Sequence, residues 1–292
     1  MSGVATGPSG DVRAVAHSDA RNFLRRAEGW LMLREDEHNL VLGLASALAD
    51  APPAEGPDGY LLGTVEVGGQ VEGCFFRTPP YKMGLTGMPL GAARQVAEAA
   101  GRRYPILPAV FGPPDVAAAV GQAWSELRRV AAQPGMPQRM YRLDQVVPPT
   151  GVAGTMRPAV EADLPLAHAW GEAFAEDAGA VFRTSAETRV HWVGRRVLFL
   201  WVDQGRPVSM AMVSGRTAHG VRIGYVYTPP EQRRRGYASA LVAALSQREL
   251  DGGARFCVLY TDLRNPTSNG IYPRVGYRPL CDLVDVDFAA GT

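Results

Sequence analysis

The chain has 292 residues, of which 46% are hydrophobic and 20% are charged, and its formal net charge is +1. This length favours two domains of ordinary size, with enough apolar material for two cores. The near-zero net charge gives no support for a nucleic-acid partner. No apolar stretch approaches the roughly 20 residues that span a bilayer, so we expect no membrane partner.

The three cysteines are dispersed along the chain and suggest a reducing environment. Cys74, Cys257 and Cys281 form no CxxC pair and no metal-binding spacing. We therefore expect a cytoplasmic protein without a metal site. The first residues lack a basic start followed by an apolar run, so they predict a flexible tail over 1–18 rather than a signal peptide.

The N-terminal half alternates between helix-like and strand-like patterns. Helical periodicity covers 19–50, and the Pro- and Gly-rich segment 51–59 is typical of a loop. We predict strands over 60–67, 70–77, 81–88, 106–111 and 139–143, with helices over 92–100 and 114–130. The break at 147–151 predicts a domain over 19–147, a linker over 148–154 and a second domain over 155–292.

The C-terminal half repeats a similar order of elements. We predict strands over 155–159, 196–202, 207–214, 221–227, 256–261 and 277–288, with helices over 161–174, 185–195, 237–250 and 267–274. Ser185 is the expected N-cap of the second of these helices, and 203–205 is the expected hairpin turn. The shared order has two explanations, a duplicated domain or convergent α/β alternation.

A basic loop between a strand and a helix is the most informative segment. Arg233, Arg234 and Arg235 precede Gly236, and an apolar helix follows directly. A helix N-terminus offers unpaired N–H groups to an anion, and glycine permits close backbone approach. Neither GxxxxGK[ST] nor GxGxxG is present. A solvated basic loop is the alternative, but the strand before and the apolar helix after favour a diphosphate site.

Two motifs in this half resemble the signatures of the GNAT acetyltransferase superfamily. Residues 233–238 resemble its coenzyme A signature, Q/R-x-x-G-x-G/A. Residues 265–277 resemble its second signature, which runs from an Asn through a Tyr to Gly-Tyr. The resemblance covers about 156–288, and the N-terminal half is similar only in element order. It implies an α/β fold of two GNAT-like domains, each a mixed, mostly antiparallel sheet with helices on both faces.

The resemblance implies an acetyl-CoA site where the strands 221–227 and 256–261 splay apart. The implied cofactor contacts are Val226, Tyr227, Thr228, Arg233, Arg234, Arg235, Gly236, Tyr237, Ala238, Ser239, Asn265 and Ser268. Tyr272 is the implied catalytic residue, and it would protonate or hydrogen-bond the departing thiolate. A packed aromatic without a catalytic role is the alternative for Tyr272.

The implied activity is N-acetyl transfer from acetyl-CoA to a primary amine, by direct attack in a ternary complex. An alkyl amine must lose a proton first, which calls for a base. Many members of the superfamily carry a glutamate early in the fourth strand, where this chain has Arg222. The remaining candidates are His219, Glu176, Asp177 and Asp262, with Thr261 or a water relay as substitutes. The missing glutamate keeps open a second function, that of a non-catalytic acyl-CoA sensor.

The N-terminal half lacks both motifs, although 84–94 is an equivalent strand and turn. We expect a degenerate GNAT-like domain that binds no cofactor and helps to wall the acceptor site. The polar run Glu35, Asp36, Glu37, His38 and Asn39 either binds a cationic acceptor or is a solvated surface. The acceptor itself is undetermined, and both a monomer and a homodimer fit the sequence.

Overall fold

The described residues of the chain form two compact units. The computed structural model describes residues 11–50, 59–177 and 185–289. Unit 1 comprises Met1–Arg34, Val41–Pro137 and Asp282–Thr292, and unit 2 comprises Glu35–Leu40 and Gln138–Cys281. Residues 1–10 of the expected tail and 51–58 of the expected loop lie outside the described residues.

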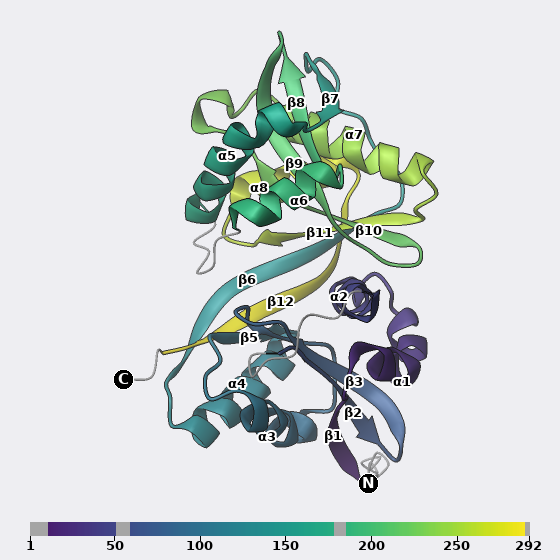
Figure 1. Ribbon diagram of the computed structural model, residues 1–292, viewed down its shortest axis with the longest axis vertical. Helices are drawn as coiled ribbons and strands as arrows, with labels where there is room; N and C mark the ends of the chain where they lie inside the picture. Colours follow the sequence, from purple (N-terminus) through teal and green to yellow (C-terminus); the bar gives the residue numbers. More distant parts are fainter. Residues whose placement is uncertain (1–10, 51–58, 178–184, 290–292) are drawn as a thin grey trace, which may run out of the picture. The chain divides into compact units, whose positions relative to one another are not determined.

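Unit 1 is built on a mixed sheet with the strand order β1-β2-β3-β4-β5-β12 (Figure 1). All neighbouring strands are antiparallel except the parallel pair β4–β5. The strands are β1 (Val12–Ala16), β2 (Leu61–Val67), β3 (Gln70–Arg77), β4 (Met83–Leu85), β5 (Ala109–Gly112) and the end of β12 (Arg278–Phe288). The helices are α1 (Ala20–Met32), most of α2 (Asn39–Asp50), α3 (Ala93–Arg103) and α4 (Pro114–Arg128).

The strand β1 corrects the prediction of a tail over 1–18. It pairs antiparallel with β2, and Val12 lies opposite Val67. Such a short strand has little local signal, because its stability comes mainly from side chains on the neighbouring strand. The prediction of a tail was therefore wrong for residues 12–16.

The sheet strands of unit 2 follow the order β6-β11-β10-β9-β8-β7. Only β10 and β11 run parallel among them. The strands are the end of β6 (Ala132–Leu143), β7 (Thr155–Pro158), β8 (Leu198–Asp203), β9 (Arg206–Arg216), β10 (Gly220–Tyr227) and β11 (Phe256–Asp262). The helices are α5 (Leu164–Asp177), α6 (Ala186–Gly194), α7 (Tyr237–Asp251) and α8 (Pro266–Val275).

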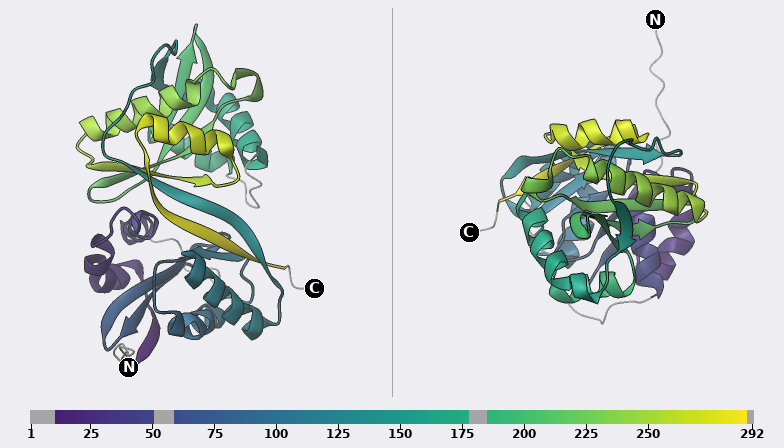
Figure 2. Two further views of the ribbon diagram at one scale, coloured as in Figure 1. Left: turned by 180° about the vertical axis from the view of Figure 1, so that it is seen from behind. Right: turned by 90° about the horizontal axis from the view of Figure 1, so that it is seen from above.

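Helices cover both faces of the unit 2 sheet because its central strands are apolar on both sides. Along β8, Leu198 and Leu200 pack in the cluster that includes α5 and α6. Phe199 and Trp201 alternate with them and pack in the cluster that includes α7 and α8. Figure 1 shows α5 and α6 in front of the strands, and Figure 2 shows α7 and α8 from behind. The predicted α/β fold with mixed sheets is confirmed.

The closing strands of the two halves are exchanged between the units. In unit 2, β6 pairs antiparallel with β11, with Leu143 opposite Cys257. In unit 1, β12 pairs antiparallel with β5, with Val284 opposite Gly112. The sequence pattern assigned 139–143 to the N-terminal domain, and the structure corrects this assignment. Strand periodicity predicts that a segment pairs but carries no information on its partner.

Both halves have the same order of described helices and strands. Each runs from one strand through two helices, three strands, a helix, a strand and a helix to a closing strand. In each, the parallel pair (β4–β5 or β10–β11) is joined through a single helix, α3 or α7. The similarity expected from the sequence therefore extends to the strand pairing. Among the described residues, no helix is long and apolar enough to cross a membrane.

Candidate functional site

The parallel strands β10 and β11 separate after three residues. Gly220, Val221 and Arg222 pair with Phe256, Cys257 and Val258, and the described residues pair no further along these two strands. Beyond this point β11 continues to pair with β6 on its other side, and β10 stays paired with β9. The expected splay between 221–227 and 256–261 is present in the structure.

A bulge turns the end of β10 away from regular pairing. Gly224 lies opposite Met212 and Tyr227 lies opposite Met210, so β10 carries one extra residue. Tyr225, within the bulge, has a φ of 56°, in the left-handed region that non-glycine residues rarely adopt. Its ring packs 4.5 Å from the ring of Phe174 and 4.9 Å from that of Trp192. This packing holds a strained backbone at the splay.

Gly236 forms the junction between the arginine loop and α7. Its φ is +84°, and a Cβ atom added there would lie 2.8 Å from Cγ2 of Val152. The first helical bond runs from Ala240 N–H to the Gly236 carbonyl. Glycine has no side chain to cap the N–H groups of Tyr237, Ala238 and Ser239. The junction therefore provides backbone donors that no side chain caps, a feature expected of an anion site.

The three arginines of the loop have different surroundings. Arg233 donates from Nε to the Thr228 carbonyl at 2.9 Å and pairs with the Asp177 carboxylate. Arg234 is exposed, has a φ of 64°, and has no ion pair with a described carboxylate. Arg235 is exposed beside Tyr237. Arg233 thus braces the loop, while Arg234 is the most available of the three to a ligand.

Two of the expected cofactor contacts cap the helix α8. The Asn265 side chain accepts a hydrogen bond from Ser268 N–H at 3.1 Å, which makes Asn265 the N-cap. A third expected contact, Tyr237 at the start of α7, has a buried side chain, and its hydroxyl donates a hydrogen bond to Asp203 at 2.6 Å. The side chains of Asn265 and Tyr237 are therefore engaged in hydrogen bonds within the protein. A contact between Tyr237 and a cofactor would have to come from its backbone.

Tyr272 lies on α8 inside the core of unit 2. Its ring centroid is 6.1 Å from that of Tyr141 and 6.0 Å from that of Tyr277. Burial raises the pKa of the Tyr272 phenol to about 12, and a hydrogen bond with Ser268 on the same helix opposes the increase. Tyr272 is therefore a packed aromatic that is neutral at physiological pH. Its catalytic role stays a prediction.

The structure does not gather the candidate bases at one point. Asp177 is paired with Arg233, and His219, which precedes β10, is bonded to Glu35. Burial would raise the pKa of Asp262, but hydrogen bonds from Arg264 outweigh it and lower that pKa, which makes Asp262 a weak base. Thr261 is buried, and Glu176 is exposed at the end of α5. Among the described residues, no group of three or more metal-ligating side chains is found.

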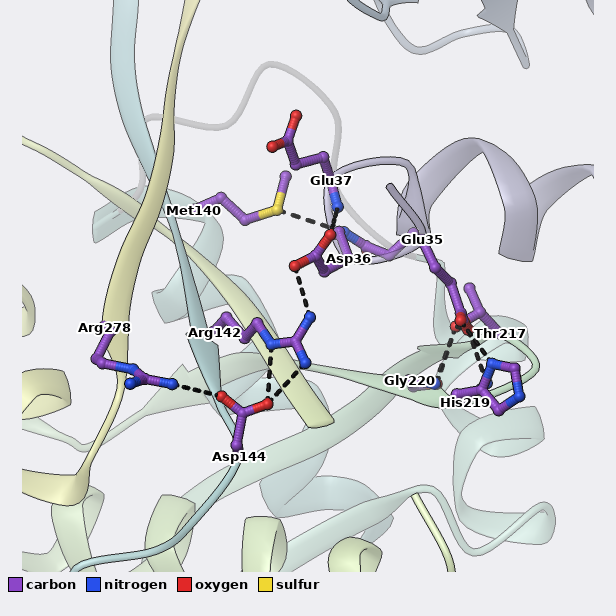
Figure 3. Close-up of polar contacts among 11 residues, drawn as sticks. Glu35, Asp36, Glu37, Met140, Arg142, Asp144, Thr217, His219, Gly220 and Arg278 are labelled. Atoms are coloured by element: carbon purple, nitrogen blue, oxygen red, sulfur yellow. Dashed lines mark hydrogen bonds and ion pairs between the residues drawn. The ribbon is translucent and has the colours of Figure 1, made fainter. Parts of the chain in front are cut away.

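The polar run 35–39 is part of unit 2. Figure 3 shows Glu35 beside His219 and Asp36 beside Arg142. Glu35 accepts hydrogen bonds from Thr217 Oγ1 at 2.6 Å and from His219 N–H at 2.7 Å, and its other oxygen lies 2.7 Å from Nδ1 of His219. Asp36 pairs with Arg142 at 2.7 Å. Glu35, His38 and Asn39 are buried. The run is therefore neither a solvated surface nor an open cation site, and these distant contacts left no local signal in the sequence.

We expect Glu35→Gln to lower the free energy of unfolding by about 1–3 kcal/mol at pH 7, because the charge strengthens three hydrogen bonds. Burial would raise the pKa of Glu35, but the bonds from Thr217 and His219 outweigh it and lower that pKa. This contribution is complete above the ordinary pKa of about 4.3 and is lost as the pH falls through the lowered value. Urea unfolding at several pH values measures it.

The matched control for Glu35→Gln is Glu161→Gln, which removes an exposed carboxylate of unit 2. We expect the control to behave as the wild type at every pH. A difference between wild type and Glu35→Gln that stays constant from pH 7 to pH 3 would contradict the charge-assisted account.

Comparisons with known proteins point to one family. Residues 167–277 match the family model described as the acetyltransferase (GNAT) family. Among curated proteins, none matches the sequence at a significant level. A solved Drosophila structure is similar to this chain, with a TM-score of 0.67, 15% identity, and coverage of 96% of this chain and 99% of that one.

Two further solved structures carry GNAT names. A GCN5-related N-acetyltransferase from Sphaerobacter thermophilus has a TM-score of 0.56 and 18% identity, and 94% of each chain is covered. A tandem GNAT protein from the clavulanic acid biosynthesis pathway has a TM-score of 0.53 and 14% identity, with 97% of this chain and 100% of that one covered. At these identities the likeness shows a shared fold. Residues 167–277 therefore match the model of the acetyltransferase (GNAT) family, and the chain shares the fold of a tandem GNAT protein.

Proposed function

We propose that the protein transfers an acetyl group from acetyl-CoA to a primary amine by direct attack within a ternary complex. The GNAT family domain supports acyl transfer in general. The observation that carries the specific proposal is the junction at Gly236, which follows the splayed strand β10 and leaves backbone donors at the start of α7.

The residues at this junction fit a diphosphate. The N–H groups of Tyr237, Ala238 and Ser239 point along the start of the helix, where the dipole favours an anion. The junction requires glycine, since Gly236 has a positive φ and a Cβ atom there would collide with Val152. We assign Arg234 and Arg235 to charge pairing with the diphosphate and Arg233 to bracing the loop.

The edge of β10 that is left unpaired by the splay fits the extended pantetheine arm of acetyl-CoA. We propose that Val226 and Thr228 pair with it through their backbone groups, and that Tyr227 or Val226 N–H stabilises the oxyanion. Asn265 and Ser268 are proposed to approach it from the start of α8. The thioester supplies the acyl group, and its thiolate leaves.

Tyr272 is proposed to donate a hydrogen bond to the departing sulfur. Full proton transfer from a phenol with a pKa of about 12 to a thiolate of about 8.5 is uphill by about 5 kcal/mol. Hydrogen bonding without transfer avoids this cost. Since β10 carries no carboxylate, we propose that a water relay removes the proton from the attacking amine.

The N-terminal unit is proposed to bind no acetyl-CoA. Its equivalent helix α3 begins at a buried junction, with Ala92 in the right-handed helical conformation as N-cap and Ala93 buried after it. This junction has alanine and not glycine as the N-cap, and it lacks the run of three arginines that precedes α7. One site per chain follows from this difference.

Isothermal calorimetry with acetyl-CoA tests the proposal on the wild type. We expect one molecule bound per chain, followed by release of free thiol when a panel of primary amines is added. Two molecules per chain would contradict the account of unit 1, and no binding would overturn the acyltransferase assignment. Binding without turnover would favour the alternative function, an acyl-CoA sensor. This alternative arises because β10 carries an arginine in place of the glutamate.

A further inference from the structure

Arg222 carries a charge that no described carboxylate balances. It lies largely among protein atoms, with part of its surface still accessible. Nε donates to the Ser214 hydroxyl at 3.1 Å, Nη2 to the Ser214 carbonyl at 2.9 Å, and Nη1 to the Asn39 side chain at 3.0 Å. All three acceptors are neutral. Burial lowers the pKa of the guanidinium, yet arginine stays protonated in proteins.

Arg222 stands where the two parallel strands separate. It is the last residue of β10 that pairs with β11, opposite Val258. Two residues further along β11, and so on the same face of the sheet, Tyr260 accepts a hydrogen bond from Asn39 at 3.1 Å. Asn39 therefore bridges Arg222 and Tyr260 across the opening of the splay and fixes the direction of the guanidinium.

The geometry leaves donors on the guanidinium for one more partner. Three of its five N–H groups are used by the described residues, and one remains on each of Nη1 and Nη2. Such a pair matches the spacing of two oxygens on one anionic group. The neighbouring Gly215 leaves room for the side chain, because a Cβ atom there would lie 2.6 Å from Nη2.

Burying part of a cation among neutral partners costs desolvation free energy, and an anion bound beside the cation offsets this cost. Segment 35–40 lies beside Arg222 and carries three acidic side chains, at 35, 36 and 37. Glu35 is engaged with His219 and Asp36 with Arg142, and among the described residues no ion pair joins any of the three to Arg222. We propose that Arg222 binds an anionic group of the amine acceptor, so that the protein selects acidic amines as substrates. This proposal rests on the proposed function.

The position of Arg222 also sets the length of the acceptor. Arg222 lies four residues before Val226, which is at most about 13 Å along the chain, because the bulge at Tyr225 shortens this part of the strand. The anionic group is therefore several bonds away from the amine that reacts at the end of the splay. Long ω-amino acids and acidic peptides fit this separation, whereas α-amino acids are too short.

The test compares ω-amino acids, from 3-aminopropanoate to 8-aminooctanoate, with alkylamines of equal length. We expect kcat/KM to favour the longer acids by about 10- to 100-fold, the range of one charge-assisted interaction. Aminoalkyl phosphonates distinguish a carboxylate from a phosphate-like group. Arg222→Gln keeps donors but removes the charge, so it should abolish the preference for acids over alkylamines, through KM. Arg222→Lys should retain part of it.

Two readouts separate this proposal from the proposed function. Acetyl-CoA affinity should be the same in wild type, Arg222→Gln and Arg222→Lys, since the cofactor junction is at Gly236. Calorimetry with N-acetyl-8-aminooctanoate and N-acetyloctylamine tests anion recognition without turnover. Equal rates and equal binding for acids and alkylamines in the wild type would overturn the proposal even if acetyl transfer occurs, and this outcome does not require either variant to fold.

Discussion

Gly236→Glu is expected to weaken acetyl-CoA binding by about 100-fold or more, the largest effect that we predict for one substitution. The new side chain meets Val152, since the Cβ atom alone would lie 2.8 Å from it. The carboxylate also repels a diphosphate at the helix start and competes with it for the backbone N–H groups, whose charge-assisted bonds are worth about 1.5–3 kcal/mol each. Calorimetric titration with acetyl-CoA measures the loss.

Gly253→Glu is the matched control for the effect of backbone strain. Gly253 has a φ of +101°, it follows the end of α7, and nothing lies within 4 Å of an added Cβ atom. Both substitutions place a side chain at positive φ and should cost about 1–3 kcal/mol of stability. Only the change at Gly236 should reduce binding. Equal loss of binding in the two variants would attribute the effect to unfolding and not to the junction.

Tyr272→Phe is expected to lower kcat by about 10- to 100-fold and to leave the Kd for acetyl-CoA unchanged. The substitution removes one hydrogen bond to a developing charge, worth about 1.5–3 kcal/mol, and keeps the ring. Because burial raises the pKa of Tyr272 to about 12, its ionisation should cause no loss of wild-type activity below about pH 11. Steady-state kinetics across this pH range measure both effects.

The control for Tyr272→Phe is its neighbour in the same core. Tyr277 is fully buried, and its hydroxyl is 2.8 Å from Ser246 Oγ. Tyr277→Phe thus removes one buried hydroxyl from a hydrogen bond and should lower stability by about 1 kcal/mol without changing kcat. If Tyr272→Phe has the same kcat as Tyr277→Phe, then Tyr272 is a packed aromatic without a catalytic role.

Local patterns predicted most of the elements of unit 2. The hairpin β8–β9 turns at Gln204 and Gly205, both at positive φ, as the composition of 203–205 indicated. Ser185 caps α6 by accepting from Thr188 N–H. These features depend on neighbouring residues, so the sequence contains their signal.

Features that depend on distant residues were not predictable in the same way. The bond between Arg222 and Asn39 joins positions 183 residues apart. The sequence indicated an unusual arginine on the fourth strand and a polar run near residue 37, but no local pattern connects them. The pairing of β6 with β11 was missed for the same reason, because any strand of suitable polarity can occupy an open sheet edge.

The exchange of closing strands has a consequence for synthesis on the ribosome. The strand β12 is made long after β5, yet it pairs with β5 in the folded protein. At typical rates of elongation, the edge of β5 waits roughly 10 to 30 seconds for its partner. An open edge is an aggregation hazard during that interval. Nascent chains of this protein should therefore need chaperone protection until β12 has been made, and neither half should fold alone when expressed as a truncated gene.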